Sequence, residues 1–181
     1  MKAIRIKQHD ITDCGAACIA SVSASYGLKL PLAQIRQYAY TNKKGTNILG
    51  MVDALSKLGF KAKGVRAEFE ALNVIPKPTI AHVTVKKVLK HFVVIYKVSN
   101  TKLKYMDPSD GKMHEITHDE FRKIWTGILI LVEPKETFEA TDKTTSNTKR
   151  FWELFRPHRG ALVQSLFGAI IVSILGLSTS I

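Results

Sequence analysis

Residues near the N-terminus combine the groups that acyl-transfer chemistry needs. Cys14 directly follows Asp13, which favours the N-terminal cap of a helix, and Gln8 lies one short loop upstream. A thiol at this position feels the positive end of the helix dipole, which lowers its pKa and favours the nucleophilic thiolate. Backbone N–H groups at the helix end and the Gln8 side-chain amide could receive the oxyanion of an acyl-transfer intermediate. The pattern therefore favours the nucleophile of a cysteine protease.

Two other interpretations of the cysteines must be weighed. A cysteine at a helix start is commonly a small buried hydrophobic residue. Cys14 and Cys18 lie one helical turn apart and could bind a metal as a pair, but no second closely spaced Cys/His pair follows in the sequence. We therefore expect no metal site. The nucleophile interpretation depends on a general base elsewhere in the chain.

A histidine and an aspartate in the second half of the chain could provide this base. His91 opens a run rich in β-branched residues, and Asp107 ends the next expected strand. Residues at one end of adjacent strands can come within hydrogen-bonding distance. An aspartate that holds one imidazole nitrogen, while the other nitrogen faces the thiol, is the general-base arrangement of thiol nucleophiles. His82 on the preceding strand is the rival base, and we expect it to be structural.

The hydrophobic pattern predicts helices first and strands afterwards. Helices are expected over residues 14–26, 31–38 and 48–58, and a short helix starts at the capping box Thr117–Glu120. The expected strands are residues 60–65, 79–85, 91–98, 102–106 and 128–132. This order indicates an α+β domain, in which the small side chains of the first helix allow it to lie close against an antiparallel sheet.

The charge and cysteine content restrict the partners and the compartment. The 181 residues include 27 basic and 15 acidic ones, a net charge of +12. Residues 150–181 hold three arginines and one glutamate, so residues 1–149 carry +10. A basic surface could bind nucleic acid, anionic lipid or an acidic peptide. We expect no nucleic acid, because no arginine-rich tract or nucleic-acid motif is present. Without a signal peptide or disulfide framework, the globular part is expected in reducing cytosol.

Together these motifs resemble the C39 family of bacteriocin-processing cysteine peptidases, papain-like domains at the N-terminus of peptidase-containing ABC transporters. The resemblance covers roughly residues 1–135 and includes the segment Trp125–Gly127. It rests on Gln8-x4-Asp13-Cys14-Gly15-x-Ala17-Cys18, on His91-Phe92-Val93-Val94-Ile95, and on Asp107-Pro108 with Gly111. The resemblance implies that Cys14 is the nucleophile, His91 the general base, Asp107 its orienting acid and Gln8 the oxyanion-hole donor.

The resemblance also implies a substrate and an assembly. Substrates of the family are precursor peptides whose helical leaders end in a double-glycine motif, and cleavage after this motif releases the cargo for export. A narrow cleft beside Cys14 would admit backbone without side chains, while the leader helix docks its apolar face in a shallow groove. The peptidase is expected to need no cofactor, since ATP and Mg would serve a nucleotide-binding domain outside this sequence. We expect a homodimeric transporter in the bacterial cell membrane, with the peptidase on the cytoplasmic side.

The C-terminal part differs in composition from the rest. Residues 136–149 are expected to form a polar linker, and residues 150–159 mix aromatic and cationic residues as an interfacial segment does. Residues 160–181 carry no charge and, as a helix, would reach roughly 33 Å, enough to cross a hydrocarbon core. We therefore expect a first transmembrane helix there, with a buried soluble helix as the alternative. The chain is then a piece of a larger exporter.

Two further functional classes remain open at this point. In one, the domain docks leader peptides and the catalytic groups are idle. In the other, a papain-like acyltransferase or amidase acts on a small amide and has a pocket for that amide in place of a peptide groove. Cleavage of a double-glycine precursor would separate both classes from the peptidase.

Overall fold

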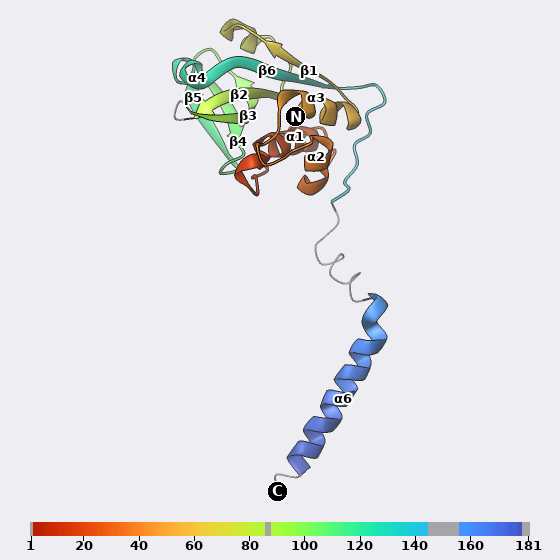
Figure 1. Ribbon diagram of the computed structural model, residues 1–181. Coiled ribbons are helices and arrows are strands. Elements are labelled where there is room, and N and C mark those ends of the chain that lie inside the picture. Colours follow the sequence, from red (N-terminus) through yellow and green to blue (C-terminus); the bar gives the residue numbers. More distant parts are fainter. Residues whose placement is uncertain (1, 86–87, 145–155, 179–181) are drawn as a thin grey trace. The chain divides into compact units, whose positions relative to one another are not determined.

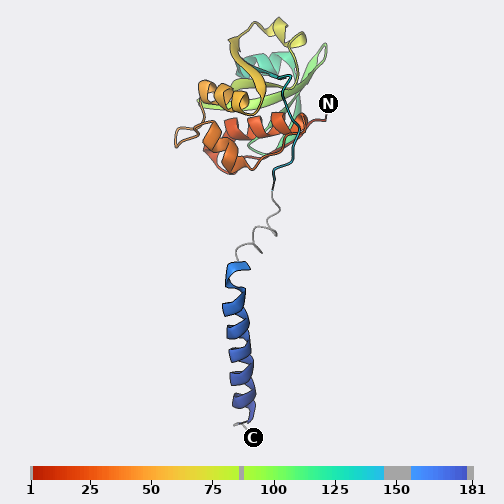
Figure 2. The ribbon, with the colours of Figure 1, turned by 90° about the vertical axis from the view of Figure 1, so that its right-hand side faces the viewer.

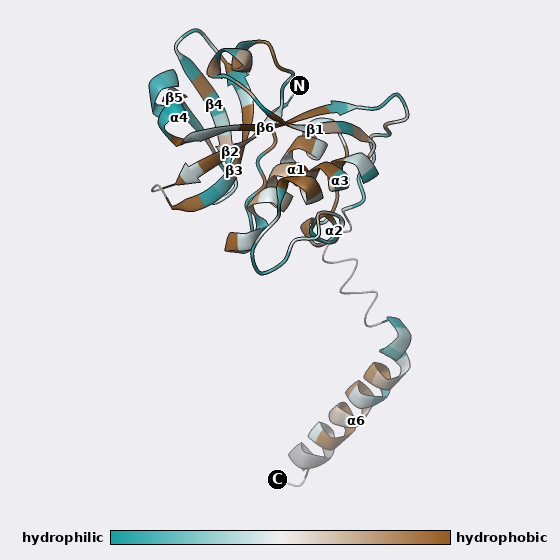
Figure 3. Ribbon diagram, turned by 45° about the horizontal axis from the view of Figure 1, so that its top comes forward, coloured by the Kyte–Doolittle hydropathy of each residue, from teal (hydrophilic) through white to brown (hydrophobic). Residues whose placement is uncertain are grey.

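Small side chains allow the first helix to lie in the centre of the domain. In the computed structural model, helix α1 (Cys14–Ser25) consists mainly of Ala, Ser, Cys and Gly, and only Ser25 among its residues is not buried. Figure 3 shows its apolar character. It packs against strand β3 (Leu89–Val98). Gly15 is needed in its first turn, because a Cβ there would lie 2.8 Å from the Cβ of Thr46. The helix predicted over residues 14–26 is confirmed.

The structure describes residues 2–85, 88–144 and 156–178. The chain divides into two units, Met1–Lys143 and Thr144–Ile181. In the first unit, three helices lie on one face of an antiparallel sheet (Figures 1 and 2). The helices of this layer are α1, α2 (Leu32–Tyr38) and α3 (Ile48–Lys57).

Six antiparallel strands form the sheet in the order β1-β6-β2-β3-β4-β5. The strands other than β3 are β1 (Phe60–Arg66), β2 (Thr79–Val85), β4 (Lys102–Asp107), β5 (Lys112–Thr117) and β6 (Trp125–Pro134). The predicted α+β architecture is confirmed. The last strand is longer than predicted, since it already begins at Trp125 and pairs with both β1 and β2. Strand β3 begins two residues before His91, so the histidine lies inside a paired strand.

Alternate residues of the strands pack into two cores on opposite faces of the sheet. On β3, Phe92 and Val94 belong to the core beneath α1, whereas Val93 and Ile95 belong to the other core. The second core is covered by the short helix α4 (His118–Ile124) and the 3-10 turn η2 (Phe69–Asn73). Helix α4 starts at the predicted capping box, with reciprocal bonds between Thr117 and Glu120. The sheet is therefore buried on both sides around β2 and β3.

A segment after β6 runs along the domain, and we call residues 135–143 the C-terminal strap. Phe138 packs its ring against Phe60, with centroids 4.6 Å apart, and against Tyr26, at 6.3 Å. Lys29 joins the strap through backbone bonds to Thr141 (2.9 Å) and from Lys143 (2.8 Å). Residues 136–143 thus lie on the domain, although they fall in the stretch expected to be a polar linker. Residues 145–149 of that stretch lie outside the described residues.

The second unit contains helix α6 (Arg159–Ser178), preceded by the short 3-10 turn η3 (Arg156–His158). Within the described parts of the chain, no helix is both long and apolar enough to cross a membrane. The transmembrane helix predicted over residues 160–181 is therefore not supported. Residues 150–155 form most of the predicted interfacial segment, and they lie outside the described residues. Residues 179–181 also lie outside them.

Candidate active site

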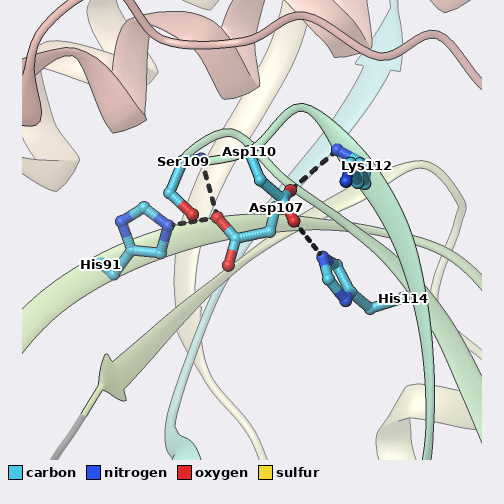
Figure 4. A network of polar contacts seen from close by, with 6 residues as sticks. All are labelled: His91, Asp107, Ser109, Asp110, Lys112 and His114. Atoms are coloured by element: carbon cyan, nitrogen blue, oxygen red, sulfur yellow. Dashed lines mark hydrogen bonds and ion pairs between the residues drawn. The ribbon is translucent and has the colours of Figure 1, made fainter.

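Two adjacent strands and one helix bring the predicted catalytic residues together. Cys14 is the first residue of α1, His91 lies near the start of β3, and Asp107 is the last residue of β4. Strands β3 and β4 pair from Val94 and Met106 onward, so His91 and Asp107 lie at the same end of this pair. Their side chains meet, with His91 Nε2 2.8 Å from Asp107 Oδ1 (Figure 4). The expected partnership of histidine and aspartate is present in the geometry.

Asp107 is held as a carboxylate by the turn that follows it. The backbone N–H of Ser109 donates to Asp107 Oδ1 at 2.8 Å (Figure 4). Burial alone would raise the pKa of Asp107, but the hydrogen bonds from His91 and Ser109, together with the charge of His91, lower it to about 2. The carboxylate is therefore ionised at neutral pH and fixes the orientation of the imidazole.

His91 has the environment of a stable imidazolium. Burial lowers its pKa, but the hydrogen bonds to Asp107 and Cys14 and the charges of these two groups outweigh burial and raise the pKa to about 9. Because Nε2 faces Asp107, Nδ1 is the ring nitrogen left for the Cys14 thiol. The chain thus brings thiol, imidazole and carboxylate together, with the imidazole held by Asp107 and in electrostatic contact with Cys14, so that a proton can pass from sulfur to nitrogen.

The turn before Cys14 differs from the sequence-based expectation. Asp13 occupies the cap position of α1, but its side chain makes no capping bond to that helix. Instead it closes the preceding 3-10 turn η1 (Ile11–Asp13), where Asp13 Oδ2 accepts from the Asp10 N–H at 3.1 Å. Its other oxygen lies 2.8 Å from Nη1 of Arg36 on α2, and the carboxylate is fully buried. Asp13 therefore anchors the nucleophile's turn to a second helix, and Arg36 had no signal in the spacing of the sequence.

Gln8 lies over the turn that carries Asp107. Its backbone N–H donates to the carbonyl of Pro108 at 2.8 Å, which attaches the N-terminal segment to this turn. Its side-chain Oε1 is buried and has no hydrogen-bond partner among the described residues. Gln8, His91 and Asp107 together line one hollow of about 470 Å³. Gln8 thus lies beside the imidazole, in the same hollow.

Cys14 lines a second hollow, of about 610 Å³, which adjoins the first. The two share the residues Ile11, Leu89 and Lys90. The sulfur-bearing residue is itself only 7% exposed. A substrate that reaches Cys14 therefore approaches along a surface groove with the thiol at its floor.

The rival histidine lies in the second hollow with a structural partner. His82 Nδ1 is 2.8 Å from Thr126 Oγ1, whose hydroxyl donates to the His82 carbonyl at 3.0 Å. Burial and the neighbouring charges of Lys90 and His91 lower the pKa of His82. An imidazole that stays neutral and bonded to β6 is less suited to pair with a thiolate than His91. Among the described residues, no group of three His, Cys, Asp or Glu side chains is placed to hold a metal ion.

Papain-like cysteine peptidases have this arrangement: a thiol at a helix tip beside an imidazole, a carboxylate behind the ring, and an antiparallel sheet beneath the helix. The chain belongs to the peptidase C39 family, whose sequence model matches residues 2–137.

Relatives and solved structures support this membership. The chain is 33% identical over 172 residues to the lactococcin-G-processing and transport ATP-binding protein of Lactococcus lactis, an alignment that covers 94% of this chain and 24% of that protein. The chain thus spans about a quarter of the length of the curated relatives it matches.

Two solved peptidase domains have the same fold. The peptidase domain of Streptococcus ComA, a bi-functional ABC transporter involved in a quorum-sensing pathway, is 36% identical with a TM-score of 0.69, and the match covers 74% of this chain and all of that one. A double-glycine-motif protease from an AMS/PCAT transporter, solved with its leader peptide, is 32% identical with a TM-score of 0.68, over 74% of this chain and 93% of that one.

Proposed function

We propose that this chain is the peptidase domain of a peptide exporter and cleaves precursor peptides after a double-glycine motif. The observation that carries the proposal is the cluster of Cys14, His91 and Asp107, in which Asp107 holds the imidazole and the imidazole interacts with Cys14. Family membership assigns the chemistry to peptide-bond hydrolysis, and the relatives named above process peptides that they also transport. A protease similar to this chain was solved with a leader peptide, which supports a leader-bearing substrate here.

The geometry suggests a role for each residue in the reaction. The Cys14 sulfur attacks the carbonyl carbon of the second glycine after its proton has passed to His91. The imidazolium, stabilised by Asp107, then protonates the leaving amine, and a thioester remains on Cys14. Water attacks the thioester with His91 as general base and releases the leader carboxylate. The Gln8 amide and the backbone N–H of Cys14 are the groups that would bind the oxyanion at each step.

The low exposure of the thiol accounts for a double-glycine requirement. Only 7% of Cys14 is accessible, so the scissile carbonyl has to descend close to the floor of the groove. Glycine residues next to the scissile bond bring backbone alone and so allow this close approach. We further propose that the whole protein is a homodimeric ABC transporter, attached to the bacterial membrane, whose peptidase domain faces the cytoplasm.

Cleavage of a double-glycine precursor peptide by the purified chain tests the proposal. Cys14→Ala should abolish product formation and leave binding of the precursor unchanged within about threefold, because the thiol contributes little contact area. His91→Ala should act in the same way. Cys18→Ala is the matched control, since Cys18 is a buried cysteine one turn further along α1 and makes no contribution to the proposed chemistry.

Two outcomes would contradict the proposal. If Cys14→Ala still produced the cleaved peptide, another group would be the nucleophile. If the unmodified chain bound the precursor tightly and released no product, the domain would be a docking module with idle catalytic groups. Mass spectrometry of the products decides both questions, because the expected leader fragment ends with the second glycine.

A further inference from the structure

A buried negative charge lies directly next to the nucleophile. Asp13 is the last residue of η1, and Cys14 is the first residue of α1. The Asp13 carboxylate is fully buried, and its Oδ2 accepts from the backbone N–H of Asp10 at 3.1 Å, so it is fixed within the turn. Because water is excluded there, its charge is screened weakly and opposes a second negative charge on the adjacent Cys14. Formation of the thiolate therefore depends on what balances Asp13.

Arg36 supplies the balancing charge. It lies on α2, and its Nη1 is 2.8 Å from Oδ1 of Asp13. Among the ion pairs of the described residues, this is the only one that Asp13 makes. The Arg36 side chain is 37% exposed, whereas the carboxylate is dry. The pair thus places its positive member at the surface and its negative member in the interior beside the nucleophile.

The other charged and titratable groups that face this turn come from several elements. Those that line the hollows around it, or lie beside the nucleophile on α1, are Lys7, His9, Asp10, Cys18, Tyr40, Lys43, Lys44, His82, Lys90, His91 and Asp107. On α3, which also packs against α1, Asp53 and Lys57 line none of these hollows. None of the cations in this set is ion-paired with Asp13 in the described part of the chain.

The charge balance of the catalytic residues depends on this pair. After the proton has moved to His91, the imidazolium is the positive charge of the catalytic cluster, against the thiolate and Asp107. Asp13 adds a third negative charge, and Arg36 balances it. Loss of Arg36 would leave an uncompensated carboxylate beside the sulfur, which disfavours the thiolate and slows its attack on the scissile carbonyl.

We propose that Arg36 is a positioning residue of the peptidase, which fixes and balances Asp13 and thereby keeps the adjacent Cys14 ready as a nucleophile. This inference rests on the proposed function and adds to it a residue outside the catalytic cluster. Arg36 lines neither of the two hollows beside the catalytic residues, so it adds no contact to a peptide bound there. Its loss should therefore lower kcat and leave KM nearly unchanged.

Cleavage kinetics and alkylation of Cys14 test the proposal together. Arg36→Met removes the charge and keeps an unbranched side chain. We expect kcat for a double-glycine peptide to fall about tenfold, with KM within about twofold of that of the unmodified chain. The pH at which iodoacetamide modifies Cys14 at half its maximal rate, which we call the alkylation midpoint, should rise by about one unit. Arg36→Lys retains a cation and should restore most of kcat and the original midpoint.

The reverse change of charge separates an electrostatic role from a purely structural one. Asp13→Asn keeps an acceptor for the Asp10 N–H but removes the carboxylate, so the alkylation midpoint should fall by about half a unit. The double variant Asp13→Asn/Arg36→Met carries neither charge, and its midpoint should return to within about 0.3 units of that of the unmodified chain. A purely structural role would impair both single variants without displacing their midpoints in opposite directions.

Arg122→Met is the matched control. Arg122 lies in the last turn of α4, as Arg36 does in α2, and pairs with the exposed Glu70 at 3.3 Å. The change in net charge is the same, and Arg122 lines neither hollow beside the catalytic residues. This variant should keep the kcat and the alkylation midpoint of the unmodified chain. Urea denaturation establishes that each variant is folded at the assay temperature.

Several results would overturn the inference. One is a folded Arg36→Met variant with unchanged kcat and alkylation midpoint. Another is an equal displacement of the midpoint in Arg122→Met, because net charge would then be the cause. If Arg36→Met does not fold, equal midpoints in Asp13→Asn and in the double variant overturn it. Alkylation needs no peptide, so absence of cleavage by the unmodified chain overturns the proposed function, while the midpoints still decide the role of Arg36.

Discussion

Asp107→Asn is the substitution that examines the imidazole–carboxylate pair most directly. Asparagine keeps an acceptor oxygen for His91 Nε2 and for the Ser109 N–H, both of which lie 2.8 Å from Oδ1. It removes the negative charge next to the imidazolium. The pKa of His91, raised to about 9 in the unmodified chain, should therefore fall while the ring keeps its orientation.

The size of the effect follows from the pKa of His91. A rise from 6.5 to about 9 corresponds to roughly 3 kcal/mol of preference for the charged ring. Asp107 and Cys14 both stabilise the charged ring, and we assign about half of the stabilisation to Asp107. Removal of its charge should therefore cost about 1.5 kcal/mol, or about tenfold in kcat/KM at neutral pH. Asp107→Ala also removes the acceptor and should cost more. His91 is 5% exposed, so solvent screens the pair little.

The sign of the pH dependence is fixed by the same values. Loss of the imidazolium limits activity on the basic side, so the unmodified chain should lose kcat/KM as the pH rises through about 9. The stabilisation of the fold by this raised pKa is likewise present below about 6.5 and is lost as the pH rises through about 9. In Asp107→Asn this fall of kcat/KM on the basic side of the profile, which we call the basic limb, should move to about pH 8.

Steady-state cleavage of a fluorogenic double-glycine peptide between about pH 5 and about pH 10 measures both effects. Asp110→Asn is the control: Asp110 lies in the same turn, but its carboxylate contacts His114 at 3.0 Å and the N–H of Lys112 at 2.8 Å (Figure 4). If kcat/KM of Asp107→Asn still fell only at about pH 9, the reasoning would be refuted. An equal displacement of the basic limb in Asp110→Asn would refute it too.

Three further outcomes follow from the structure. Iodoacetamide should modify Cys14 and spare Cys18, because burial raises the pKa of the fully buried Cys18 thiol, and peptide mass mapping locates the label. Arg36→Met should lower the free energy of unfolding by about 2 to 3 kcal/mol in urea denaturation, since it leaves the buried carboxylate of Asp13 without its cation. Gly111→Ala should destabilise the domain by about 1 to 2 kcal/mol in the same assay and lower kcat, because its φ is +69° and a Cβ would meet the segment before Gln8 at 2.9 Å.

Each of these outcomes has a clear contrary result. Equal labelling of both cysteines would show that the core around α1 opens readily. An Arg36→Met variant as stable as the unmodified chain would mean that water satisfies the Asp13 carboxylate. A Gly111→Ala variant with unchanged stability and kcat would show that the turn and the N-terminal segment move apart without consequence for the oxyanion groups.

Local signals in the sequence were sufficient for most of the elements. Gly27 and Gly59, both with positive φ, follow α1 and α3 at the predicted ends. The Thr117–Glu120 capping box marks the start of α4 to the residue. The contact between His91 and Asp107 could also be predicted, because residues at one end of paired antiparallel strands are neighbours whatever the details of the register.

Contacts between elements distant in the chain could not be obtained in this way. Asp13 matched the cap pattern, but its partner Arg36 lies on another helix, and nothing in their spacing indicates the pair. The strap likewise had the composition of a linker, because its single large apolar residue, Phe138, acquires significance only when Tyr26 and Phe60 lie beside it. The conformation of the loops decides which charged side chains lie near the thiol, so the sequence pattern did not predict them either.

The strap has a practical consequence for work on the isolated peptidase. A recombinant fragment that stops at residue 135 would leave the rings of Tyr26 and Phe60 without the ring of Phe138 that covers them, and Lys29 without its backbone partners in the strap. Such a fragment should melt earlier and associate through the uncovered aromatic surface. Expression boundaries are better placed beyond residue 143, where the first folded unit ends.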